Sequence, residues 1–76
     1  MIKVGDIVRN KTTGEYGTVH FSSFGVSIHM WSEELNGLVK TLGFPASSYS
    51  EDWETVDMPE GYELAKYGGL IKKDKE

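Results

Sequence analysis

Two histidines are the residues of this sequence whose spacing most directly suggests chemistry. His20 and His29 are the chain's only histidines, and each falls in a segment with the alternation of a β-strand. If the two segments pair as a hairpin, the imidazoles are diagonal neighbours on its outer face, with Cβ atoms roughly 7 Å apart. A zinc site would need a third or fourth protein ligand, and no His-Glu-x-x-His pattern is present. We therefore predict no metal site and expect both histidines to be exposed strand residues.

Serines and carboxylates are plentiful, but their patterns do not predict catalysis. Serines cluster at 22–23 and at 47–50 without a Gly-x-Ser-x-Gly elbow, and serines in turns usually serve turn hydrogen bonds. Asp52 and Glu54 flank Trp53, so strand alternation turns both carboxylates toward solvent while the indole faces the core. The chain has no cysteine, which excludes disulfides and thiolate chemistry. We predict a non-enzymatic protein with no catalytic residues and no cofactor.

Aromatic residues are numerous for 76 residues: 2 tryptophans, 4 tyrosines and 3 phenylalanines. Most must build the core of so small a domain, but Tyr16 and Trp31 fall on the face of the predicted hairpin that points away from it. Exposed tryptophan and tyrosine are enriched at binding hot spots. The alternative is that the segment after Met58 folds back and covers this face. The residues predicted to bind a partner are Tyr16, His20, His29, Trp31, Glu33 and Glu34.

The elements that must position these side chains are short strands. Segments rich in β-branched and aromatic residues alternate with Gly, Ser, Asn and Pro turns. Five short strands within about sixty residues favour a small closed barrel, because closure hides the edges of the sheet. We predict an all-β fold with strands at residues 2–9, 16–21, 26–31, 38–42 and 53–56.

The second and third strands predict a specific register. If Phe21 pairs with Val26 across a four-residue turn, Val19 lies opposite Ile28. A slip of one residue would turn the apolar side chains to the other face, so burial specifies the register. We expect Phe21 and Trp53 to lie in the core. The predicted core face of the hairpin comprises Val19, Phe21, Val26, Ile28 and Met30, with Gly17 leaving room for Met30 or for strong strand curvature.

Three short motifs resemble those of SH3-like barrels, including domains with the KOW motif. They are the run from Val4 to Val8 with its Gly-Asp pair, the later Gly14 and Gly17-Thr18-Val19, and the closing segment from Trp53 to Val56. The resemblance implies a five-stranded SH3-like barrel over residues 1–58, in the style of small bacterial or phage proteins. Residues 59–76 would be a C-terminal extension with a charged tail. The extension is either a helical turn at 60–67 or an extended segment packed on the barrel.

The charge distribution indicates which classes of binding partner are favoured. The net charge is −4, and residues 33–63 hold eight acidic residues against Lys40 alone. A non-catalytic protein-binding module, of accessory or inhibitory type, is the main prediction. Binding of nucleic acid by a KOW-like domain is the alternative. The negative net charge disfavours it, because neutralisation of phosphates supplies most of the affinity for nucleic acid. A third possibility is that the acidic residues mimic nucleic acid. No apolar run is long enough for a signal peptide or a membrane span, so we expect a cytoplasmic protein.

Overall fold

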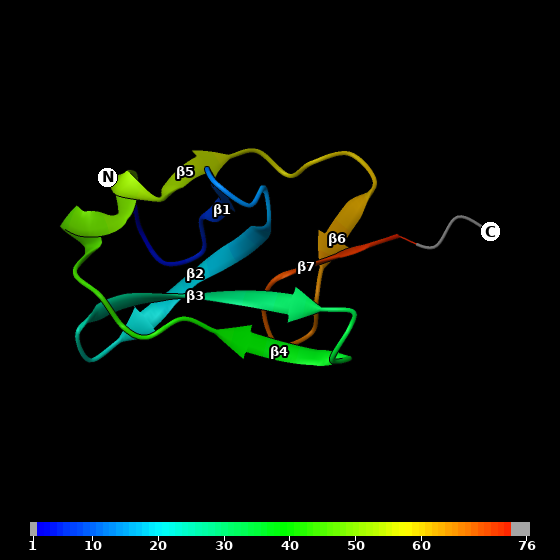
Figure 1. The fold of residues 1–76 in the computed structure, drawn as a ribbon, viewed down its shortest axis with the longest axis horizontal. Helices are drawn as coiled ribbons and strands as arrows, with labels where there is room; N and C mark the ends of the chain where they lie inside the picture. Colours follow the sequence, from blue (N-terminus) through cyan, green and yellow to red (C-terminus); the bar gives the residue numbers. More distant parts are fainter. Residues whose placement is uncertain (1, 74–76) are drawn as a thin grey trace.

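The computed structural model describes residues 2–73, apart from the side chains of residues 49 and 50. The described chain is all-β, with one short 3₁₀-helix (Figure 1). Its elements are β1 (Ile7–Asn10), β2 (Tyr16–Ser22), β3 (Gly25–Ser32), β4 (Gly37–Lys40), η1 (Ala46–Glu51), β5 (Trp53–Val56), β6 (Tyr62–Leu64) and β7 (Leu70–Lys72).

Five strands form one antiparallel sheet in the order β4-β3-β2-β1-β5, and β6 and β7 form a separate hairpin. Within the sheet, β1 lies between β2 and β5, so Ile7 is opposite Thr18 on one side and Val56 on the other. The hairpin leans on one end of the sheet, where β7 contacts β2 and β3, while η1 lies toward the other end (Figure 1). The predicted strands are all present, with shifted ends.

The predicted register of β2 and β3 is confirmed: Phe21 is opposite Val26, and Val19 is opposite Ile28. The predicted role of Gly17 is also confirmed. A Cβ atom on Gly17 would stand 3.1 Å from Cγ of Met30 and 2.9 Å from the carbonyl oxygen of His29. Only glycine therefore allows β3 to cross β2 this closely.

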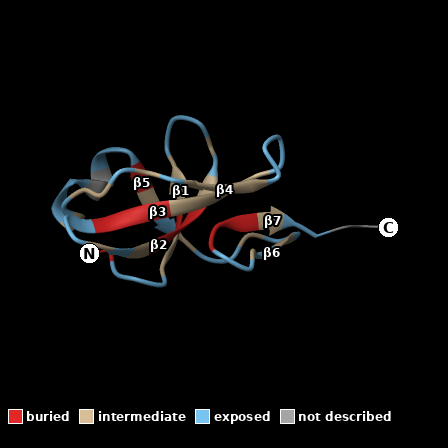
Figure 2. Ribbon diagram, turned by 90° about the horizontal axis from the view of Figure 1, so that it is seen from below, coloured by how far each residue is buried: buried red, intermediate tan, exposed pale blue. Residues whose placement is uncertain are grey.

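The core lies beneath the centre of the sheet. Val8 and Ile28 are completely buried, and Trp53 is 7% exposed, which confirms the expectation that Trp53 is a core residue. Figure 2 shows this buried region along β3 and a second one at the start of β7. The core cluster comprises Ile2, Val8, Val19, Val26, Ile28 and Trp53, with Met30, Phe44 and Ala46 packed against it.

The prediction that Phe21 is a core residue is wrong, because its side chain is 80% exposed. Its partner Val26 is buried, and the backbone of Val26 also forms a bridge to Phe44. Phe44 packs against the core at this point, so the core ends before it reaches Phe21. Phe24, at the tip of the β2–β3 turn, is likewise 74% exposed.

The outer strands and the C-terminal segment complete the architecture. β4 and β5 are the two outer strands of the sheet, with no pairing recorded between them in residues 2–73. The C-terminal segment takes the extended form rather than the helical turn, as the β6–β7 hairpin. In the described part of the chain, no helix has the length and apolar character that a membrane span requires.

Candidate interaction groove

The non-core face of β2 and β3 carries the side chains that alternation placed there, but the β6–β7 hairpin covers part of it. Tyr16 is half-buried, and its ring lies 5.1 Å from the ring of Tyr62 at a tilt of 57°. Trp31 is also half-buried, with Gly69 against its backbone nitrogen. The expectation that the segment after Met58 folds back onto this face is therefore confirmed in part. The segment covers part of the face, and the two side chains remain partly exposed.

A surface hollow lies where the hairpin meets the sheet. Its apolar lining comes from Tyr16, Met30 and Trp31 of the sheet and from Tyr62 and Leu70 of the hairpin. We call this hollow the aromatic groove. Its polar lining consists of Thr13, Gly14, Glu15, Glu33 and Lys72.

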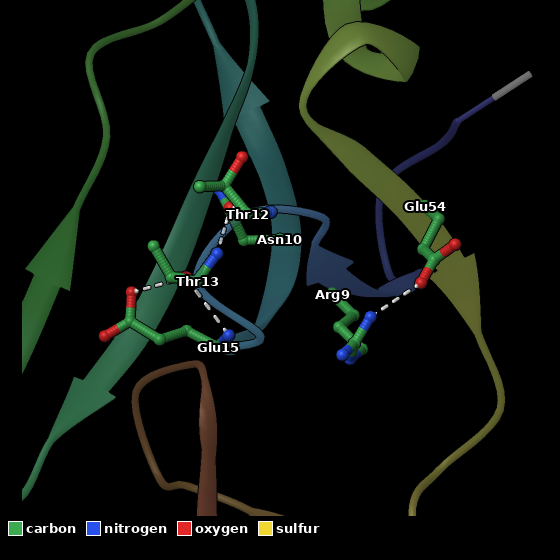
Figure 3. Close-up of polar contacts among 6 residues, drawn as sticks. All are labelled: Arg9, Asn10, Thr12, Thr13, Glu15 and Glu54. Carbon is green, nitrogen blue, oxygen red and sulfur yellow. Dashed lines mark hydrogen bonds and ion pairs between the residues drawn. The ribbon is translucent and has the colours of Figure 1, made fainter.

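The β1–β2 connection forms one rim of the groove and is held by its own side chains (Figure 3). The Oδ1 atom of Asn10 accepts hydrogen bonds of 2.9 Å from the backbone N–H groups of Thr12 and Thr13. The Thr13 hydroxyl donates to the Glu15 carboxylate at 3.2 Å. An Asx-type turn of this kind orders a loop locally, so the carboxylate of Glu15 is presented at the groove with little freedom.

The β3–β4 connection forms the opposite rim. Its turn is closed by hydrogen bonds from the N–H of Leu35 to the Ser32 hydroxyl and from the N–H of Asn36 to the Glu33 carbonyl. Glu33 and Glu34 are exposed on this turn. Glu33 lines the aromatic groove, and both glutamates line a second hollow that shares Trp31 with it. Trp31 therefore lines two hollows that are both bordered by carboxylates.

The two histidines lie away from the groove, beneath the β6–β7 loop. Their rings are stacked, with centroids 3.6 Å apart and planes 10° apart. His20 Nε2 is 2.8 Å from the Thr18 hydroxyl oxygen, and that oxygen accepts the N–H of Gly69 at 2.9 Å. His29 Nδ1 lies 3.4 Å from the Tyr67 carbonyl. Both rings are half-buried, so the expectation that they are exposed is wrong: the hairpin loop covers them.

The environment of the pair favours neutral imidazole at His20. Burial lowers the pKa of His20 below its ordinary value of 6.5, and the neighbouring His29 and Lys40 lower it further. Parallel stacking at this distance does not direct two ring nitrogens at one ion. No group of three metal-ligating side chains occurs within the described residues.

The structure brings three of the predicted binding residues, Tyr16, Trp31 and Glu33, to the aromatic groove and places Glu34 on the adjoining hollow. It separates His20 and His29 from them. The sequence reasoning missed Tyr62, Leu70 and Lys72, which the hairpin contributes. The alternation of Tyr62 with Leu64 was a strand signal, although only the fold shows which strand faces Tyr16. Comparisons of the chain with protein-family models, with curated proteins and with solved structures found no match.

Proposed function

We propose that the chain is a non-catalytic protein-binding module whose aromatic groove holds an extended peptide with a lysine or arginine beside an apolar residue. The observation that carries this proposal is the composition of the groove. Tyr16, Trp31 and Tyr62 line it together with Met30 and Leu70, and Glu15, Glu33 and Glu34 border it or the adjoining hollow. Tyrosine and tryptophan rings offer large contact areas at low entropic cost, and the carboxylates attract a cationic side chain.

An SH3-like barrel is the fold we propose for residues 1–58. Two observations support it: β1 lies between β2 and β5, and the 3₁₀-helix η1 directly precedes the last strand of the sheet. SH3-like domains bind peptides in aromatic grooves, which agrees with the proposed occupant. A cytoplasmic location and a kinship with small bacterial or phage proteins remain predictions.

Nucleic acid is a poorer occupant of the same groove. Stacking of bases on Tyr16 and Trp31 would be available. However, phosphates would have to approach the carboxylates of Glu15 and Glu33, with only Lys72 opposite them among the residues that line the groove. Because phosphate contacts supply most of the affinity in such complexes, we rank a peptide first.

The test is selection from a phage-displayed library of random ten-residue peptides, followed by titration of a selected peptide. We expect selected peptides to contain Lys or Arg next to an aromatic, aliphatic or proline residue. Trp31→Ala should weaken binding about thirtyfold, as for a hot-spot residue, while the melting temperature changes little because Trp31 is half-buried.

Phe24→Ala is the matched control, because Phe24 is an exposed aromatic residue outside the groove. It should bind the peptide as the wild type does. Peptides without basic residues that bind Trp31→Ala as tightly as the wild type would contradict the proposal. A fluorescent single-stranded oligonucleotide measured in parallel should not bind, and salt-sensitive binding to it that Trp31→Ala abolishes would favour nucleic acid instead.

A further inference from the structure

The β6–β7 loop contacts the stacked histidines through the backbone of Gly68. A Cβ atom on Gly68 would lie 2.8 Å from Cβ of His29 and 3.0 Å from Nε2 of His20. No side chain fits between the loop and the two rings. Any change in the rings or their hydrogen bonds is therefore transmitted directly to the backbone of the hairpin.

The hydrogen bonds at this contact depend on the protonation of His20. The Thr18 oxygen accepts the N–H of Gly69, and Thr18 is 6% exposed. When His20 Nε2 is unprotonated, it accepts the Thr18 hydroxyl proton at 2.8 Å and every group is paired. When Nε2 carries a proton, it must donate to the same oxygen, and the hydroxyl proton needs another acceptor in a buried position, which costs free energy.

Charge acts in the same direction as the hydrogen bonds. The hairpin loop lies over His20, and burial disfavours the charged form of its imidazole. Lys40 of β4 is opposite His29, and Lys66 lines the hollow beside His20 together with the phenol of Tyr67. Among the described residues that line this hollow, none is a carboxylate. His29 and Lys40 belong to the sheet and stay beside His20 whether or not the hairpin is docked, so the hairpin's own contribution is the burial of His20.

The hairpin that rests on the histidines also completes the aromatic groove. Gly68 and Gly69 contact the histidine face, whereas Tyr62 and Leu70 line the groove. The two ends are joined by antiparallel pairing, in which Leu64 is opposite Leu70 and Tyr62 is opposite Lys72. Loss of the contact at the glycines would therefore remove one wall of the groove.

We propose that protonation of His20, in the stacked His20–His29 pair, releases the β6–β7 hairpin from the sheet and dismantles the aromatic groove, so that partner binding is switched off in mild acid. The binding half of this inference rests on the proposed function; the release of the hairpin does not.

The sign of the effect follows from proton linkage. Burial first, and then His29 and Lys40, lower the pKa of His20; departure of the hairpin relieves the burial, whereas His29 and Lys40 remain on the sheet. The undocked state therefore binds protons more readily, and docking weakens as the pH falls from above 6.5 toward the lowered pKa. Docking is strongest above pH 6.5, and the docking constant falls by at most about tenfold for each pH unit of that window.

Amide hydrogen exchange followed by NMR tests the release. The reporter is the N–H of Gly69, which donates to Thr18, and the internal control is the N–H of Val26, which donates to Phe44 within the core region. With intrinsic rates corrected for pH, we expect the protection factor of Gly69 to fall between pH 8 and pH 5, by a factor set by the difference in the pKa of His20 between the docked and undocked states. The protection factor of Val26 should change only as far as the free energy of global unfolding changes over the same pH range.

The control variant is the double substitution H20Q/H29N. Glutamine can present an acceptor where Nε2 of His20 stands, and asparagine can present a donor where Nδ1 of His29 stands, yet neither titrates. Gly69 should stay protected at pH 5 in this variant. Equal loss of protection in wild type and variant would overturn the proposal. If the variant does not fold, the test uses the wild type alone. Imidazole NMR resonances that titrate while the protection factor of the Gly69 amide stays constant would also overturn the proposal.

The release and the binding are measured separately. Exchange is recorded without peptide, and affinity for a selected peptide is then compared at pH 8 and pH 5. A chain that releases its hairpin but selects no peptide contradicts the proposed function alone. A chain that binds a peptide in the groove but keeps Gly69 protected at pH 5 contradicts the switch alone.

Discussion

Substitution of Gly69 by alanine tests how the hairpin is fastened to the sheet. Gly69 has φ of +80°, and a Cβ atom there would stand 2.7 Å from the carbonyl carbon of Met30 and 2.9 Å from its Cα. Both contacts are with backbone, so the strain cannot be relieved by a side-chain rotation. The hairpin must move away from β3, and Gly69 then loses its hydrogen bond to Thr18.

The magnitude can be worked from the parts. Positive φ costs alanine about 1–2 kcal/mol. The lost hydrogen bond adds about 1 kcal/mol, and re-exposing Leu70, which is 6% exposed, adds about 2 kcal/mol. We expect Gly69→Ala to lower the free energy of unfolding by about 4 kcal/mol. The loss in free energy of unfolding cannot exceed what docking of the hairpin contributes, because an undocked hairpin has already lost these contacts.

Gly61→Ala is the matched control in the same hairpin. Gly61 has φ of +85°, but a Cβ atom there would meet nothing within 4 Å, so only the conformational cost of about 1–2 kcal/mol applies. The assay is urea unfolding followed by tryptophan fluorescence, with exchange of the Thr18-bonded amide as the local readout. If Gly69→Ala and Gly61→Ala lower the free energy of unfolding by amounts that agree within about 0.5 kcal/mol, the contact of Gly69 with β3 and Thr18 is refuted.

Three further predictions use the same unfolding assay. Trp53→Ala should cost on the order of 3–5 kcal/mol because the side chain is buried in the core; a loss near 1 kcal/mol would show that the core is assembled differently. Phe21→Ala should change stability by less than about 0.5 kcal/mol because Phe21 is 80% exposed, and a core-sized loss would reinstate the sequence prediction. The Arg9–Glu54 ion pair spans 3.0 Å with side chains 40% and 45% exposed. Arg9→Ala should therefore cost under about 1 kcal/mol at low salt and less at 1 M salt; an effect independent of salt would point to packing instead.

Alternation in the sequence was sufficient to predict the β2–β3 register because each strand has one apolar and one polar face. Val19, Val26 and Ile28 could only be buried together in one register. Phe21 obeyed the same alternation and was still misplaced. Alternation says which face a side chain is on but not how far the core extends along the strand, and that limit is set by Phe44 from a distant segment.

The candidate site was predictable only in part for a related reason. Tyr16, Trp31 and Glu33 belong to neighbouring strands and turns, so the hairpin register alone places them together. Tyr62 and Leu70 reach the groove through tertiary packing of the C-terminal hairpin, which no local pattern encodes. The loop that covers the two histidines depends on the same packing, since a loop with a side chain at Gly68 could not lie over them.

The position of β1 between β2 and β5 also constrains the order in which the chain can assemble. β2 and β3 are joined by a tight turn, with Ser22 opposite Gly25, and hairpins of this kind form within about 1–10 μs. Pairing of β1 with β5 joins residues as far apart as Arg9 and Glu54, 45 positions along the chain, so its loop-closure entropy must be overcome first. We expect β5 to be the last strand to join the sheet. In a folding chain, Trp53 would therefore stay unburied until β5 pairs with β1, after the β2–β3 hairpin has formed.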